Sequence, residues 1–477
     1  MNILFASSEA VPFAVSGGLA EVAGALPKAL KAKGEDVRVI LPLYGSVTEE
    51  QRAEMKYLLN FDVAVAWRRQ YCGVFEAKAD GVTYYLLDNE YYFKRSGLYG
   101  YYDDAERFAF FSRAVLDTVK HLEELDGFKP DIIHCNDRQT ALIPVYYNCF
   151  YRDTPGYEDI RTVYTIHNIQ YQGKYGMELI EDVIGIPPEH RQLLEYDGCV
   201  NFMKAGIECA DRVTTVSPTY AEEILDPWFS WGLDPILNAR KWKLQGILNG
   251  IDTDGYNPVS DKNIVHNFSV EDVEEGKAIN KKALQERLNL PQRADVPLIG
   301  MVTRLTSHKG LDLVKYIVDD LLQRDVQMVV LGSGEWIYEN FFREIQNKYP
   351  EKFCYCAGFV PELARKIYAS SDIFLMPSKS EPCGLAQMVA CRYGTLPIVR
   401  ETGGLKDSII DCGEEGGFGF TFKTYNADDM LAAIDRALGA YANKPDLKLL
   451  RERCMTQDFT WGRSANTYIR MYKDLVK

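Results

Sequence analysis

The sequence lacks any long hydrophobic run and any excess of positive charge. No stretch of about 18 or more apolar residues occurs, so a membrane-spanning helix is not predicted. The formal net charge is -14, whereas proteins that bind nucleic acids or anionic membranes carry basic faces. We therefore expect neither nucleic acids nor membranes as partners. An anionic small substrate would have to be held by a few local cations and backbone amides.

Patterns typical of metal sites, disulfide frameworks and secretion signals are also missing. The 6 histidines show no metal-type spacing, and the 11 cysteines are scattered. The only close cysteine pair, Cys354 and Cys356, is not a Cys-x-x-Cys motif. We expect no metal site and mostly reduced thiols, as in a cytoplasmic protein. The N-terminus has no basic segment before a short apolar run, which favours a first strand over a signal peptide.

What the sequence does contain is an alternation of short apolar runs with helical patterns, in two series. A chain of 477 residues is too long for one core. The predicted strands of the first series are residues 3–6, 37–42, 82–87, 132–134, 162–166 and 213–216. Those of the second are residues 246–248, 298–302, 327–331, 353–357, 373–376, 396–399 and 418–422. This α/β pattern predicts two Rossmann-like, doubly wound domains, with ligand bound between them at the carboxyl ends of the strands.

The predicted domains are residues 1–245 and 246–457, followed by a C-terminal helix over residues 458–477. The boundary falls near residues 249–258, which are dense in turn-forming residues. Residues 261–286 are charged and polar, and they are expected to form a surface loop and then a helix. In the last segment, Trp461, Ala465, Tyr468 and Tyr472 recur at helical spacing.

Each predicted domain has a glycine loop after a strand. Ser16, Gly17 and Gly18 precede a helical pattern, an arrangement that suits phosphate or sugar hydroxyls because free backbone N–H groups point at the loop. Such loops are more often purely structural, so this signal alone is weak. Pro27, inside the same helical pattern, predicts a kink or break. Thr402, Gly403 and Gly404 form the second loop, which makes a shared cleft more credible.

Specific motifs connect these features. The segments that carry the resemblance are residues 9–13, 16–22, 24–27, 107–111, 165–173, 216–220, 248–252, 303–305, 308–310, 378–385, 392–395 and 402–407. They include Ser16-Gly17-Gly18-Leu19-Ala20-Glu21-Val22, His167-Asn168-Ile169-Gln170-Tyr171-Gln172-Gly173 and Glu381-Pro382-Cys383-Gly384-Leu385. In this order and at this spacing, they resemble the bacterial glycogen synthase and plant starch synthase family over nearly the whole chain.

The resemblance implies a GT-B fold of two Rossmann-like domains facing a central cleft. It also implies retaining transfer of glucose from ADP-glucose to the non-reducing end of an α-1,4-glucan such as glycogen or a maltooligosaccharide. No metal or other cofactor is implied, because two cations can neutralise the donor diphosphate. A C-terminal helix that packs back on the first domain is likewise implied by the family.

The resemblance also assigns roles in the donor half of the site. Arg304 and Lys309 grip the diphosphate, and the backbone amides of Cys383, Gly384 and Leu385 face the donor. Glu381 contacts the donor sugar and stabilises positive charge at the anomeric carbon. By residue type alone, the two cations could equally be a solvated pair, and Glu381 could be a stabilising acid at a helix start. Cys383 has no suggested histidine partner, so its side chain is expected to pack.

The remaining roles come mainly from the resemblance. His167 and Asn168 end a strand, where a doubly wound fold places ligand groups. His167 is expected to contact the donor sugar, and Asp137 to lie close to the reacting centre. Asn249 is expected to contact a sugar hydroxyl, and Phe359 to lie against adenine. The alternatives are a structural histidine and a core phenylalanine.

Four residues near the expected site depart from the family pattern: Val15, Arg138, Ser380 and Ala386. Val15 stands where the family carries a lysine that supplies positive charge to the donor phosphate. Arg138 stands in place of a tryptophan, Ser380 in place of an aromatic residue and Ala386 in place of a polar one. Two functions remain open at this point: an active synthase, and a weakened paralogue that binds α-glucan or an active synthase. A different GT-B transferase or a phosphorylase fits less well, because no segment matches a pyridoxal-phosphate lysine site.

Overall fold

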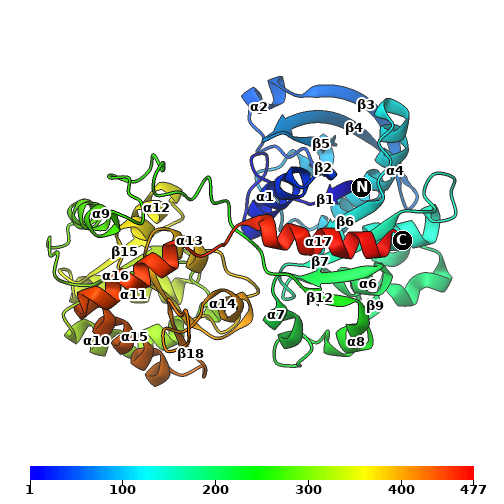
Figure 1. The fold of residues 1–477 in the computed structure, drawn as a ribbon. Coiled ribbons are helices and arrows are strands. Elements are labelled where there is room, and N and C mark those ends of the chain that lie inside the picture. The colour runs from blue at the N-terminus through cyan, green and yellow to red at the C-terminus, as the bar shows by residue number, and fades with distance from the viewer. The chain divides into compact units, whose positions relative to one another are not determined.

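The computed structural model describes residues 1–477, which divide into two compact units (Figure 1). Unit 1 comprises Met1–Asn249 together with Trp461–Lys477, and unit 2 comprises Gly250–Thr460. Each unit is built on its own mainly parallel sheet. None of the helices combines the length and apolar character that crossing a membrane would require.

The sheet of unit 1 has nine strands in the order β12-β11-β7-β6-β1-β2-β5-β4-β3. Its parallel strands are β1 (Asn2–Ala6), β2 (Asp36–Pro42), β5 (Val82–Asp88), β6 (Ile132–Asn136), β7 (Arg161–Ile166), β11 (Arg212–Thr215) and β12 (Leu244–Gly246). All six strands predicted for the first series are present. The strand predicted at residues 246–248 is wrong as the start of the second sheet, because β12 pairs with β11 of the first.

An antiparallel hairpin extends one edge of this sheet and was missed by the sequence analysis. Its strands are β3 (Lys56–Val65) and β4 (Arg68–Ala79), and β4 also pairs antiparallel with β5. Most side chains of β3 are exposed or half-buried. An edge strand with one solvent-exposed face has no continuous apolar run. It therefore lacks the pattern that identified the buried parallel strands.

The helices of unit 1 are α1 (Gly18–Ala32), α2 (Glu49–Ala53), α3 (Glu90–Phe93), α4 (Asp104–Asp126), α5 (Leu142–Tyr146), α6 (Phe202–Cys209), α7 (Pro218–Glu223), α8 (Asp234–Ala239) and α17 (Trp461–Leu475). Short 3₁₀ or π segments are η1 (Tyr147–Tyr151), η2 (Ile180–Ile184), η3 (Pro188–Leu193) and η4 (Lys241–Lys243). A small antiparallel sheet joins β8 (Lys174–Tyr175), β10 (Cys199–Asn201) and β9 (Glu195–Tyr196).

The predicted break at Pro27 is wrong: α1 continues through it, with Val22, Leu26 and Leu30 buried. The free energy gained by packing this apolar face outweighs the free energy that proline costs inside a helix.

Helix α17 belongs to unit 1 although it is the last element of the chain (red in Figure 1). It packs against α1, and the four residues at helical spacing, from Trp461 to Tyr472, are buried. The Tyr472 hydroxyl lies 2.6 Å from Nδ1 of His134 on β6. His134 Nε2 lies 2.6 Å from the hydroxyl of Thr165 on β7. A polar chain thus connects the C-terminal helix to the middle of the sheet.

The sheet of unit 2 is six-stranded, parallel and ordered β15-β14-β13-β16-β17-β18. Its strands are β13 (Leu298–Val302), β14 (Gln327–Gly332), β15 (Phe353–Ala357), β16 (Ile373–Met376), β17 (Leu396–Arg400) and β18 (Phe420–Phe422). Its helices are α9 (Val273–Arg287), α10 (Leu311–Gln323), α11 (Trp336–Lys348), α12 (Pro361–Ser370), α13 (Ala386–Arg392), α14 (Gly403–Ser408), α15 (Ala427–Ala442) and α16 (Lys444–Met455), with the 3₁₀ turn η5 (Ser307–Lys309). The six remaining strands predicted for the second series are all found here.

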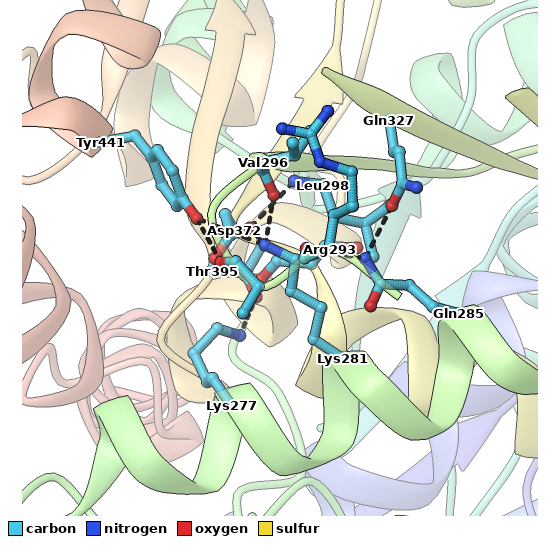
Figure 2. A network of polar contacts seen from close by, with 12 residues as sticks. Lys277, Lys281, Gln285, Arg293, Val296, Leu298, Gln327, Asp372, Thr395 and Tyr441 are labelled. Atoms are coloured by element: carbon cyan, nitrogen blue, oxygen red, sulfur yellow. Dashed lines mark hydrogen bonds and ion pairs between the residues drawn. The ribbon is translucent and has the colours of Figure 1, made fainter. Parts of the chain in front are cut away.

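Helix α9 is highly charged, yet several of its charged side chains are buried rather than solvated (Figure 2). Lys281 Nζ lies 2.8 Å from Oδ2 of Asp372, whose Oδ1 is 2.7 Å from Arg451. Lys277 Nζ donates to the Thr395 hydroxyl at 2.7 Å and to three backbone carbonyl oxygens. The helix expected in this charged segment is confirmed as α9. Its lysines can be buried because each ammonium is fully hydrogen-bonded.

Candidate active site

The glycine loop of unit 1 is held from one side by a buried carboxylate. Oε2 of Glu9 accepts from the Ser16 backbone N–H at 2.6 Å and from the Ser16 hydroxyl at 2.8 Å. Burial raises the pKa of Glu9, although the bonds from Ser16 oppose that shift. A side chain added at Gly17 or Gly18 would meet nothing within 4 Å. These glycines leave open space in front of the N-terminus of α1, where a ligand could approach the backbone closely.

Asp137 and His167 lie together at the carboxyl ends of neighbouring strands β6 and β7. Asp137 Oδ1 accepts the backbone N–H of His167 at 2.8 Å. His167 Nε2 lies 2.8 Å from Oδ1 of Asn136, whose own amide donates to backbone carbonyls. His167 therefore carries its proton on Nε2 and keeps a free lone pair on Nδ1. Asp137 also has a φ of 56°, a left-handed conformation that is concentrated at functional sites.

Burial shifts the titration of both groups. It raises the pKa of Asp137 to about 6, against the opposing effect of the His167 N–H bond. Burial lowers the pKa of His167 to about 3. At neutral pH this end of the sheet therefore presents one carboxylate and one neutral imidazole.

The two asparagines assigned to this half of the site differ in their surroundings. Oδ1 of Asn168 accepts the backbone N–H of Gln170 at 3.0 Å, so this side chain shapes the local turn. Asn249, the last residue of the first segment of unit 1, is buried, and its Oδ1 has no hydrogen-bond partner. A buried, unpaired amide oxygen is costly, and a ligand hydroxyl would satisfy it.

In unit 2, Lys309 and Glu381 form an ion pair at the ends of neighbouring strands. Lys309 follows β13 and Glu381 follows β16, which pair in parallel. Lys309 Nζ lies 2.6 Å from Glu381 Oε2, which also accepts the Ser378 hydroxyl at 2.9 Å. Burial alone would raise the pKa of Glu381, but the Lys309 charge and these hydrogen bonds hold it below its usual value. Glu381 is therefore ionised at neutral pH.

Arg304 lies on the same loop as Lys309 but is arranged differently. Its side chain is exposed and forms no ion pair, whereas Lys309 is half-buried. Gly310, the N-cap of α10, has a φ of 74°, and a side chain there would collide with the carbonyl of Pro377. Because Gly310 has no side chain, the loop that carries Arg304 and Lys309 can pass close to the carboxyl end of β16, which precedes Glu381.

The second glycine loop packs directly against the segment that follows Glu381. A side chain at Gly403 would collide with the carbonyl of Glu381, and one at Gly404 with the carbonyl of Cys383. The Gly404 N–H donates to the carbonyls of Glu381 and Pro382. Unit 2 thus brings the two motifs together, although they are separate in the sequence.

The other assigned residues of unit 2 occupy varied positions. Phe359 is 77 % exposed, which rules out the alternative of a core residue. Cys383 is buried, and Gly384 has a φ of 69°. Leu385 is the N-cap of α13, and Thr402 is the buried N-cap of α14. Of the departures from the family pattern, Ser380 and Ala386 are half-buried, with Ala386 opening α13.

The other two departures, Val15 and Arg138, lie in unit 1. The Val15 side chain is 57 % exposed. The Arg138 guanidinium lies over two rings, 5.6 Å from the centre of Tyr99 and 5.5 Å from that of Tyr171. Sequence reasoning missed two supporting residues. Asn136 contacts His167, which is distant in the sequence, and Ser378 donates to Glu381 across a short loop.

Comparison with solved structures defines the class of protein. A sucrose-phosphate synthase from Thermosynechococcus elongatus shares the fold, with a TM-score of 0.62 over 99 % of this chain and 98 % of that one, at 18 % identity. The catalytic domain of starch synthase IV from Arabidopsis thaliana, bound to ADP and acarbose, superposes with a TM-score of 0.91. It covers 100 % of this chain and 99 % of that one, at 34 % identity. The fold is therefore that of the GT-B glycosyltransferases.

Sequence comparison defines the family. The starch synthase catalytic domain pattern matches residues 2–239, and the pattern of glycosyl transferases group 1 matches residues 284–448. Glycogen synthases of Bacillus cereus (strain ATCC 10987 / NRS 248) and Clostridium novyi (strain NT) are 49 % and 48 % identical, over 100 % of this chain and 100 % and 99 % of theirs. The chain belongs to the glycogen synthase and starch synthase family, and it is a retaining hexosyltransferase. The predicted fold class and family are confirmed, and these relatives support the synthase rather than the weakened paralogue.

Proposed function

We propose that this chain transfers glucose from ADP-glucose to the non-reducing end of an α-1,4-glucan, with retention of configuration. The observation that carries the proposal is the Lys309–Glu381 ion pair beside the unpaired Arg304, in a chain 49 % identical to glycogen synthases over its full length. The starch synthase IV structure, which is bound to ADP and acarbose, supports both the nucleotide and the glucan.

In this proposal unit 2 supplies the charges for the leaving group. As the bond between the anomeric carbon and the diphosphate breaks, negative charge accumulates on the diphosphate. Arg304 has a free planar fork for two phosphate oxygens, and Lys309 acts as a point charge. Glu381, ionised next to Lys309, faces the opposite charge that develops at the anomeric carbon. Together these groups stabilise charge separation in the transition state.

Unit 1 supplies hydrogen-bond acceptors for the sugar hydroxyls and one carboxylate. The free Nδ1 of His167 and the unpaired Oδ1 of Asn249 each accept a hydrogen bond from a sugar hydroxyl. Asp137 is ionised above about pH 6 and lies near the reacting centre. The open backbone at Gly17 and Gly18 approaches the donor phosphate or sugar. On unit 2, the donor also contacts the backbone amides from Cys383 to Leu385, the loop from Thr402 to Gly404 and the exposed ring of Phe359.

The test is ADP release from ADP-glucose with glycogen as acceptor. Wild type should turn over steadily, and Glu381→Gln should lose about 10²–10³-fold in kcat, the usual cost of removing one electrostatic group from such a site. Glu362→Gln is the matched control, because Glu362 is a half-exposed glutamate in an ion pair on α12. Wild-type release no faster than that of Glu381→Gln would contradict the proposal. The new linkage, examined by NMR, should be α-1,4.

We also propose a cytoplasmic location. None of the eleven cysteines, from Cys72 to Cys454, forms a disulfide, as expected for a protein in a reducing compartment. Cell fractionation should recover the protein with cytoplasmic markers, and recovery outside the cytoplasmic membrane would contradict this.

A further inference from the structure

Gln387, in the first turn of α13, is a fully buried glutamine that none of the roles proposed above uses. Its Nε2 donates to the carbonyl oxygen of Cys383 at 3.2 Å and to that of Gly384 at 2.9 Å. The same nitrogen donates to the hydroxyl oxygen of Ser408, the last residue of α14, at 3.0 Å. One side chain thus contacts both the segment that follows Glu381 and the helix that begins at the second glycine loop.

These contacts belong to a closed ring of hydrogen bonds within unit 2. The Ser408 hydroxyl, which accepts from Gln387, donates to the carbonyl oxygen of Gly404 at 2.6 Å. The Gly404 N–H in turn donates to the carbonyl oxygens of Glu381 and Pro382. The ring therefore returns to the segment in which it began. Because hydrogen bonds are directional, it fixes how the two glycine-containing segments lie against each other.

The bonds from Gln387 also determine which way two backbone N–H groups point. In a planar trans peptide, the C=O and the N–H of one peptide group point in opposite directions. The carbonyls of Cys383 and Gly384 point at Gln387, so the N–H groups of Gly384 and Leu385 point away from it. Neither N–H donates to another group of the chain, and both residues are only half-buried. Two unpaired backbone donors are therefore available to a ligand.

The segment wraps closely around this glutamine at Gly384. The φ of Gly384 is 69°, and a side chain there would come within 2.6 Å of Gln387 Oε1. Oε1 is itself buried and has no hydrogen-bond partner, which costs free energy. The opposite orientation of the amide would cost more, because it would place Oε1 against two carbonyl oxygens. The carbonyls of the segment therefore decide which end of the Gln387 amide faces them.

We propose that Gln387 is a positioning residue of the donor site, which aims the N–H groups of Gly384 and Leu385 at the diphosphate of ADP-glucose. The proposal rests on the function proposed above, in which the amides from Cys383 to Leu385 face the donor. Because Gln387 is buried, it acts through the two peptide groups whose carbonyls it holds. Backbone donors that are aimed in advance stabilise negative charge on a phosphate without any cost of reorientation.

The test is calorimetric titration of ADP, together with initial rates at varied ADP-glucose and at varied maltoheptaose. Gln387→Met removes both N–H donors at nearly constant side-chain length, so the two peptide groups lose their fixed direction. This variant should weaken ADP binding and raise the KM for ADP-glucose about tenfold or more, as expected when hydrogen bonds to a charged group are lost. The KM for maltoheptaose should stay within twofold of wild type.

Gln285→Met is the matched control. Gln285, on α9, is also buried in unit 2, and its Nε2 donates to Gln327 Oε1 at 2.7 Å and to the Arg293 carbonyl at 3.0 Å (Figure 2). Neither Gln285 nor its partners are among the residues assigned to the donor. Both variants should lower the melting temperature, whereas only Gln387→Met should weaken ADP binding. A general loss of stability would affect both variants alike.

Two results would overturn the proposal directly: ADP affinity of folded Gln387→Met within threefold of wild type, or an equal loss of ADP affinity in Gln285→Met. If Gln387→Met does not fold, Ser408→Ala decides, because it removes one member of the ring. Its Kd for ADP should rise at least threefold, and a smaller change would overturn the proposal.

ADP binding without donor turnover separates this inference from the function itself. If wild type binds ADP in a Gln387-dependent way but transfers no glucose, the function proposed above fails and the positioning role stands. If wild type transfers glucose while Gln387→Met keeps its KM for ADP-glucose within threefold, the function stands and the positioning role is overturned. Absence of ADP binding by wild type would overturn both.

Discussion

At the scale of single residues, the departures from the family pattern have different physical meanings. Val15 is solvent-exposed, so it adds nothing to the core. Arg138 is packed over two tyrosine rings at the edge of a cavity. Sequence comparison can mark both positions as unusual, but it cannot tell them apart, because side-chain direction depends on residues distant in the chain.

Val15→Lys should raise kcat/KM for ADP-glucose by about tenfold or more, because it adds a cation beside the open backbone of Gly17 and Gly18. The melting temperature should not change, since the side chain is exposed. Val259→Lys is a matched control, because Val259 is also 57 % exposed but lies in unit 2 and is not one of the assigned residues. Equal rates for wild type, Val15→Lys and Val259→Lys would show that position 15 does not sense the donor.

Lys309→Ala should move the acid limb of the pH–rate profile upward. With Lys309 present, its charge keeps the pKa of Glu381 below the usual value. Without it, burial dominates, the pKa of Glu381 rises, and the carboxylate is lost at a higher pH. The measurement is kcat against pH from about 5 to 9, alongside Lys348→Ala, which breaks a surface pair with Asp319. A lower rate with an unshifted acid limb would show that the ion pair does not control Glu381.

At the scale of elements, the sequence pattern was reliable for buried parallel strands and for the C-terminal helix, but not for the antiparallel edge of the first sheet. Strands such as β13 and β16 are continuous apolar runs because both faces of the sheet are covered. The hairpin of β3 and β4 has one wet face and was missed. The helix α9 was expected, but the burial of its lysines could not be predicted, because their partner Asp372 lies far along the chain.

Tyr472→Phe should destabilise unit 1 by about 1–3 kcal/mol, because it leaves Nδ1 of buried His134 without its partner on α17. Urea unfolding measures the loss, with Tyr316→Phe, at an exposed position, as the control. An unchanged unfolding midpoint would mean that the His134–Tyr472 bond adds no net stability.

His134, together with His167, makes the stability of the folded chain depend on pH. Burial lowers the pKa of His134 to about 3, and that of His167 likewise. Between about pH 6.5 and 3 the unfolded chain therefore binds protons that the folded chain refuses, so this contribution to stability is lost as the pH falls.

At the scale of the whole molecule, the chain is not a simple succession of two units. Unit 2 is one continuous segment, Gly250–Thr460, whereas unit 1 needs both Met1–Asn249 and Trp461–Lys477. The boundaries predicted at residues 245 and 457 therefore fall a few residues before those of the structure. The more important difference is connectivity, which a linear pattern does not express.

This connectivity predicts how fragments should behave. Residues 250–460 should fold alone with a cooperative thermal transition. Residues 1–249 should be unstable, because the surface covered by the buried residues of α17 is then exposed. Joining residues 461–477 to 1–249 through a flexible linker should restore a cooperative transition, followed by circular dichroism. A cooperative transition for residues 1–249 alone, equal to that of the linked form, would contradict the prediction.

The sequence by itself determined the fold class, the family, most of the parallel strands and the positions of the two glycine loops. These features depend on local patterns: apolar runs that must be buried, and glycines that permit close approach. Only the tertiary structure decided that Lys309 pairs with Glu381, that α17 completes unit 1, that the charged face of α9 is buried, and that Gln387 joins the segment after Glu381 to the second glycine loop. Each of these depends on groups that are distant in the chain and become neighbours only on folding, when burial and proximity set their charge states and hydrogen bonds.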